Sequence, residues 1–201
     1  RVLFRSRVFV CETENKTHEV VRALDRKTGQ ELWRTSWPGS MSVIFIAKPN
    51  GDWIRSTPAY DGERLYVGGI REVMVCLDAK TGAEVWRVDF LKDFKGELPP
   101  FGFVSSPLLD GEHLYVQAVG SFLKMEKRTG KVVWRVLVEE SAAAFENPFS
   151  SPTFATIQGV RQIVVQTRKE MTGVDPESGT VLWRREVPAR SEEHTSELQS
   201  H

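Results

Sequence analysis

Histidine and cysteine, the residues that most often provide metal ligands and nucleophiles, are scarce in this chain. Its 201 residues include four histidines and two cysteines. Cys11 and Cys76 are 65 positions apart, and His18 and His113 are equally isolated. Zinc sites need ligands at short, fixed spacings, while serine hydrolases and phosphate-binding loops need glycine-flanked signatures that this sequence does not contain. The sequence therefore supports no zinc, hydrolase or nucleotide chemistry.

The recurrent acidic residues are the other candidates for chemistry. Asp25, Asp78, Glu126 and Asp175 each follow an apolar residue and precede two variable residues, then Thr or Ser, then Gly. A calcium site needs roughly six to eight converging oxygens, whereas these acids occupy the same position in four separate segments. There the acid can accept hydrogen bonds from the following backbone and hydroxyl groups, while the glycine provides the positive φ of a short turn. We therefore predict turn residues, and we predict no catalytic or metal-binding residue.

The four segments define a repeat. After the glycine come two variable residues, an apolar residue, Trp and Arg, and successive tryptophans are 53, 48 and 49 residues apart. This period is typical of propeller blades or solenoid units. The predicted structural positions of the repeat are Asp25, Gly29, Trp33, Asp78, Gly82, Trp86, Gly130, Trp134, Asp175, Gly179 and Trp183.

Short strands separated by turn signals fill each repeat. Ser-x-Pro segments begin at Ser56, Ser105 and Ser150, and Asp-Gly turns at Asp61 and Asp110 separate stretches rich in β-branched and aromatic residues. Four short antiparallel strands per unit, without an amphipathic helix, predict an all-β propeller. Blades are expected at about residues 7–34, 55–90, 104–138 and 149–187, or about three and a half blades of a propeller of seven or eight.

Both ends look foreign to this repeat. Residues 1–6 and 190–201 resemble translated sequencing-library adapters, which predicts a natural fragment spanning residues 7–189, with the rest of the propeller missing. The chain carries 27 Lys and Arg against 27 Asp and Glu without a basic block, which argues against nucleic acid as a partner. Its longest apolar run, residues 41–47, is too short for a membrane span.

At these motifs the chain resembles the pyrroloquinoline-quinone-type (PQQ-like) β-propeller repeat family, over nearly all of residues 7–189. Repeats of that family carry Ser-x-Pro, Asp-Gly, Tyr-Val and then Leu-Asp-x-x-Thr-Gly-x-x-x-Trp, as from Leu77 to Trp86 here. The resemblance implies that the repeated tryptophans pack between neighbouring blades. The family includes quinoprotein alcohol and sugar dehydrogenases, the outer-membrane assembly lipoprotein BamB and other bacterial extracytoplasmic propellers.

The resemblance implies one of three functions. A quinoprotein dehydrogenase is expected to show a vicinal Cys-Cys pair, a Ca²⁺ site and a catalytic Asp, and this chain contains no vicinal pair. We therefore expect a non-catalytic, BamB-like periplasmic scaffold that binds a protein or small ligand without a cofactor. The alternatives are a fragment of a dehydrogenase that uses PQQ and Ca²⁺, and the sensor domain of a membrane kinase. The residues also leave open whether Cys11 and Cys76 face each other between blades or stay buried as free thiols.

A partner is expected at the loop face of the propeller, where the connections between blades vary most and carry aromatic residues. The same face carries polar side chains that could line a pocket for an acidic group or a peptide. The residues predicted to form this binding face are Trp53, Arg55, Arg71, Phe103, Gln117, Gln166, Arg168 and Lys169.

Overall fold

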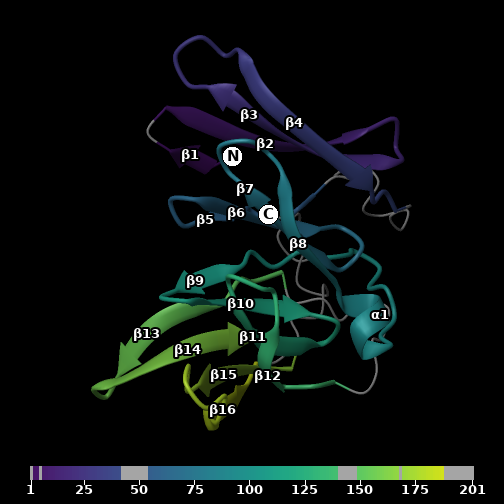
Figure 1. Cartoon of the computed structure of the whole chain (residues 1–201). Helices are drawn as coiled ribbons and strands as arrows, with labels where there is room; N and C mark the ends of the chain where they lie inside the picture. Colours follow the sequence, from purple (N-terminus) through teal and green to yellow (C-terminus); the bar gives the residue numbers. More distant parts are fainter. Residues whose placement is uncertain (1, 5, 42–53, 140–148, 168, 188–201) are drawn as a thin grey trace, which may run out of the picture.

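The computed structural model describes residues 2–4, 6–41, 54–139, 149–167 and 169–187. Within these residues the chain forms four antiparallel sheets of four strands each, which follow one another along the sequence (Figure 1). We number these sheets blades 1 to 4. The all-β propeller architecture predicted from the repeat is thereby confirmed, and short turns join the strands within each blade.

The bounds of the strands are as follows. Blade 1 contains β1 (Val2–Phe4), β2 (Arg7–Glu14), β3 (His18–Asp25) and β4 (Glu31–Pro38). Blade 2 contains β5 (Ala59–Tyr60), β6 (Arg64–Gly69), β7 (Val73–Asp78) and β8 (Glu84–Asp89), followed by the short helix α1 (Phe90–Phe94). Blade 3 contains β9 (Leu108–Asp110), β10 (His113–Ala118), β11 (Ser121–Glu126) and β12 (Val132–Val136). Blade 4 contains β13 (Thr153–Ile157), β14 (Val160–Gln166), β15 (Glu170–Val174) and β16 (Val181–Glu186).

The first blade differs from the prediction because it has four strands. Val2–Phe4 pair antiparallel to β2, so residues set aside as foreign complete the sheet. The blade also extends to Pro38, beyond the expected end at residue 34. The foreign origin of residues 1–6 and 190–201 stays a prediction, and residues 190–201 lie outside the described residues.

Three hydrophobic clusters join the blades in sequence order. Successive residues of a strand point to opposite faces of its sheet, so in blade 2 Leu65 and Val67 pack toward blade 1 whereas Tyr66 packs toward blade 3. A third cluster around Tyr115 and Ile163 joins blades 3 and 4. The core therefore lies between the blades.

The repeated acids hold the turn between the last two strands of a blade. Asp78 Oδ1 accepts hydrogen bonds from the backbone of Lys80 and Thr81 and from the Thr81 hydroxyl, at 2.7–3.0 Å. Asp25 and Asp175 make the equivalent bonds in their own turns. These bonds stabilise the carboxylate form, and they lower the pKa of all three aspartates.

The tryptophans of blades 1 to 3 dock on the turn of the next blade, whereas Trp183 donates to the Gln162 side chain of its own blade. The indole N–H groups donate to backbone carbonyls of that turn, namely Trp33 to Ala79 at 3.1 Å, Trp86 to Lys127 at 2.8 Å and Trp134 to Glu177 at 3.2 Å. The ring covers the turn glycine so closely that a Cβ built on Gly130 would lie 2.7 Å from Cε3 of Trp86. Glycine is required there for this contact as well as for its φ of 75°.

Two buried carboxylates hold the blades together at the opposite ends of the strands. Glu19 Oε1 accepts a hydrogen bond from the backbone N–H of Ile70 at 2.6 Å, which joins blades 1 and 2. Glu72 Oε2 accepts from the backbone N–H of Val119 at 2.9 Å, which joins blades 2 and 3. The side chains are 0% and 2% exposed, and burial raises the pKa of each to about 7.

Substitution Gly130→Ala tests the Trp–Gly contact, with Gly29→Ala as its matched control. Gly29 has a similar φ of 72°, but a Cβ there would meet nothing within 4 Å. The free energy of unfolding of the control should fall only by the cost of a positive φ at a residue other than glycine, roughly 1–2 kcal/mol. The free energy of unfolding of Gly130→Ala should fall by a further ~1–3 kcal/mol, because the Trp86 ring must move. Urea unfolding of the two variants measures the difference, and equal losses would contradict the docking role.

Substitution Glu72→Gln tests the buried carboxylate through the pH dependence of unfolding. The folded state keeps a proton on Glu72 up to about pH 7, whereas the unfolded chain releases it near 4.5. The proton therefore stabilises the folded state below pH 4.5, and this stability is lost as the pH rises to 7, by up to ~3 kcal/mol. The glutamine amide oxygen can still accept from Val119, so the variant should lose less stability than the parent chain over this range. Urea unfolding at several pH values checks this, with the exposed Glu112→Gln as the control. A slope unchanged by Glu72→Gln would contradict the assignment.

Candidate functional site

The described residues of the predicted binding face lie at separate places in the fold. Trp53 and Arg168 lie outside the described residues. Phe103 is 1% exposed and stacks on Phe90 with ring centroids 6.3 Å apart, so its ring belongs to the core between blades 2 and 3. Lys169 is exposed at the start of the last hairpin, and Arg55 is half-buried before β5.

Gln117 and Gln166 form a contact between blades 3 and 4. The Gln117 side-chain amide donates to the backbone carbonyl of Gln166 at 2.8 Å, and its Oε1 accepts from the Ser105 hydroxyl at 3.2 Å. Gln117 is 8% exposed. Its polar atoms are thus used within the fold and do not face a pocket.

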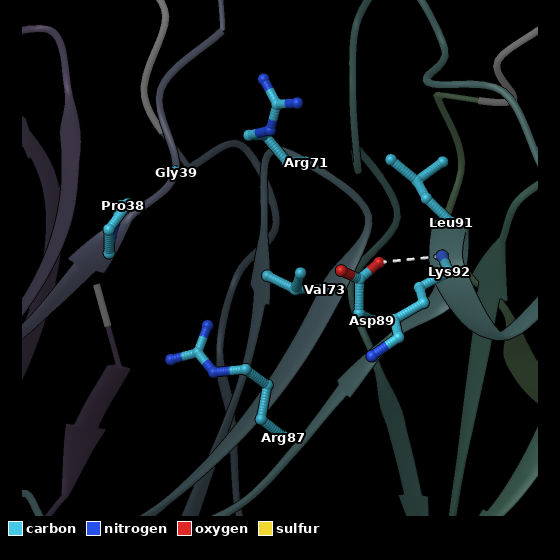
Figure 2. A pocket seen from close by; sticks show the side chains of 8 residues that line it. All are labelled: Pro38, Gly39, Arg71, Val73, Arg87, Asp89, Leu91 and Lys92. Atoms are coloured by element: carbon cyan, nitrogen blue, oxygen red, sulfur yellow. Dashed lines mark hydrogen bonds between the residues drawn. The ribbon is translucent and has the colours of Figure 1, made fainter.

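Arg71 is the predicted residue that lines a groove. The groove has a volume of about 480 Å³ and lies where the end of β4 approaches β8, the loop between β6 and β7, and α1 (Figure 2). Three cationic side chains and one carboxylate line it, together with backbone and apolar groups. The lining residues are Pro38, Gly39, Arg71, Val73, Arg87, Asp89, Leu91 and Lys92.

The cations of this groove are held to different degrees. The Arg87 guanidinium donates to Glu84 at 2.7 Å and lies 5.0 Å from the centre of the Trp37 ring, so it is fixed by two neighbours. Arg71 donates a hydrogen bond to the Ser40 carbonyl at 3.4 Å. Lys92 is exposed, and its backbone N–H donates to the Asp89 carboxylate at 3.1 Å. Asp89 thus caps α1, whereas Arg71 and Lys92 are exposed and line the groove (Figure 2).

Glu19 lies beneath the groove. Its carboxylate accepts from the Trp37 indole at 2.6 Å and sits between two glycines, because a Cβ built on Gly39 or Gly69 would lie 2.5 Å from Oε2. Desolvation raises the pKa of Glu19 to about 7, while hydrogen bonds from Ile70 and Trp37 and the charges of Arg87 and Arg71 partly oppose that rise. The carboxylate therefore anchors the wall of the groove and is closed to a ligand.

Glu19 and Glu72 were not among the predicted residues, although the repeat contains a signal for them. Glu19 precedes Asp25 by six positions, and Glu72 precedes Asp78 by the same number. The equivalent position is Gly120 in blade 3 and Lys169 in blade 4. A second acid in two of four repeats is a weak pattern, and its backbone partners lie about 50 residues further along the chain.

The thiols and imidazoles of the described residues form no reactive site. Cys11 and Cys76 are free and pack in different inter-blade clusters, so the two cysteines do not face each other. Burial raises the pKa of both thiols to about 12, which keeps them protonated and unreactive. His18 contacts the Thr17 hydroxyl at 2.9 Å. Among the described residues, no three His, Cys, Asp or Glu side chains gather as a metal site would require.

Comparison with known proteins identifies relatives of two kinds among curated sequences. The chain is 30% identical over 120 residues to the serine/threonine-protein kinase AfsK of Streptomyces griseus, covering 59% of this chain and 14% of the kinase. It is 26% identical over 148 residues to the quinohemoprotein alcohol dehydrogenase ADH IIB of Pseudomonas putida, covering 69% of this chain and 21% of the enzyme. The chain therefore spans a small part of either relative.

The fold matches a solved BamB structure. The crystal structure of BamB from Moraxella catarrhalis superposes with a TM-score of 0.66 at 16% identity, covering 90% of this chain and 50% of BamB. In the described part of the chain, no helix has the length and apolar character needed to cross a membrane. The family model described as outer membrane protein assembly factor BamB matches residues 17–200. The chain therefore belongs to the PQQ-like β-propeller family that this model describes.

Proposed function

We propose that this chain is part of a non-catalytic, extracytoplasmic β-propeller scaffold that binds a protein or a small ligand at its loop face. The observation that carries the proposal is the open, cation-lined groove between blades 1 and 2. Its walls are fixed by contacts that also hold the blades together, as expected of a preformed binding surface. The family description, an outer membrane assembly factor, supports the extracytoplasmic location.

The roles of the described acidic residues also support a scaffold. Asp25, Asp78 and Asp175 each bond the backbone of their own turn, and Glu19 and Glu72 each bond the neighbouring blade. Each of these carboxylates already has a structural partner. We accordingly propose no cofactor for this segment.

A PQQ-dependent dehydrogenase is the second candidate, because ADH IIB and the 1-butanol dehydrogenase (quinone) of Thauera butanivorans are both similar to this chain. The described residues do not fit a Ca²⁺ site, since the turn acids lie in separate blades and each binds its own turn. The similarity to AfsK favours, as a further candidate, a sensor domain in a membrane kinase.

Reconstitution separates the scaffold from the dehydrogenase. The complete protein, incubated with PQQ and Ca²⁺, should give no alcohol-dependent reduction of a redox dye. Fractionation of cells that produce the complete protein should place it outside the cytoplasm. Turnover of alcohol above the level of the quinone alone would overturn the scaffold, and cytoplasmic recovery would overturn the location.

A further inference from the structure

We propose that the groove between blades 1 and 2 binds an extended acidic peptide segment, whose carboxylates pair with Arg71 and Lys92 beside the fixed Arg87. This inference rests on the proposed binding function and names the class of partner. Three segments of the chain bring these cations together, because Arg71 lies between β6 and β7, Arg87 on β8 and Lys92 on α1 (Figure 2).

The positive charge of the groove favours the binding of an anion. Its lining holds three cations and one acid, Asp89, which keeps its charge while it accepts a hydrogen bond from the Lys92 backbone, and Arg87 is paired with Glu84. Within the described part of the chain, neither Arg71 nor Lys92 forms an ion pair with an acidic side chain. Guanidinium groups bind carboxylates through paired N–H donors, and such charge-assisted bonds are stronger than neutral ones. Two carboxylates would therefore find partners that the fold leaves available.

Arg87 is the preorganised member of the set. Its Nε and Nη2 atoms donate to Glu84, and the guanidinium plane rests over Trp37, which the buried Glu19 in turn holds. The side chain therefore loses little conformational freedom when a ligand binds. Arg71 and Lys92 are exposed, so they supply charge that can adjust to the ligand.

The shape of the groove favours a peptide over a small anion. Among the described strands, β8 is the last in the order β5-β6-β7-β8, so its outer edge has backbone groups without a partner in that sheet. Arg87 and Asp89 are two residues apart and therefore point to the same side of β8. Pro38, Val73 and Leu91 add apolar surface between the charges. An extended peptide that alternates acidic and small apolar side chains matches this combination.

Fluorescence anisotropy with the full chain tests the proposal. The probe is a fluorescein-labelled peptide, Ser-Glu-Val-Glu-Ser, and its matched control carries Gln in place of both Glu. The acidic peptide should bind, the Gln peptide should bind at least about fivefold more weakly, and added NaCl should weaken the acidic peptide because exposed charges are screened.

Paired variants locate the site. Arg71→Gln with Lys92→Gln should weaken the acidic peptide about fivefold or more. Lys27→Gln with Lys80→Gln removes the same charge from exposed turns at the other end of the strands and should leave the affinity unchanged. Urea unfolding confirms that both pairs fold. An equal loss of affinity in the two double variants, or no binding of the acidic peptide by the parent chain, would overturn the proposal.

Competition separates the peptide from other anions. Unlabelled acidic peptide should displace the probe, whereas inorganic phosphate at the same concentration should not. Equal displacement by phosphate would overturn the peptide proposal and indicate a small-anion site. Anisotropy measures peptide binding and does not depend on quinone turnover. A negative binding result would therefore overturn the peptide proposal without overturning the scaffold proposal. Dehydrogenase activity would conversely overturn the scaffold even if the peptide bound.

Discussion

The contact between a tryptophan and the turn glycine of the next blade is the constraint on which the rest of this structure depends. A four-stranded sheet has two apolar faces, and each blade here can bury them only against its neighbours. The Trp33, Trp86 and Trp134 rings fix the distance between blades at one end of the strands. At the other end Glu19 and Glu72 fix the first two junctions by bonding backbone N–H groups. A groove between blades can keep its shape because both ends are held.

The third junction is chemically different. Gly120 occupies the position of the bridging glutamate, and at the end where Trp134 docks the buried Lys124 donates to the Pro176 carbonyl at 2.9 Å and to Glu177 at 3.0 Å. Gln117 adds its bond to the Gln166 backbone. The repeat therefore conserves the geometry of stacking while the polar contacts change from one junction to the next. The cationic groove belongs to the first junction, where Gly39 and Gly69 make room for Glu19 below it.

Local patterns made the fold predictable from sequence, and non-local contacts limited the prediction of the site. The acidic residue, glycine and tryptophan of each repeat recur at fixed spacing because one turn and one docking contact need all three, so the blades could be located. The strand Val2–Phe4 was missed because its residues were assigned a foreign origin. Phe103 lies in the connection between α1 and β9 and Gln117 lies near the end of β10, and contacts with neighbouring blades decide that both are buried. Glu19 reaches a backbone group 51 positions away, for which no local pattern exists.

The docking bond of the tryptophan has a consequence for how such blades diverge. The acceptor is a backbone carbonyl, so the bond itself does not depend on the side chain of the residue that carries it, and Ala79, Lys127 and Glu177 all serve. Substitutions at these positions leave the bond in place, whereas a bond to a side chain would be lost. Neighbouring blades can therefore exchange surface residues, including those that bind a partner, without losing their stacking. New binding surfaces can then arise on one blade while the propeller keeps its shape.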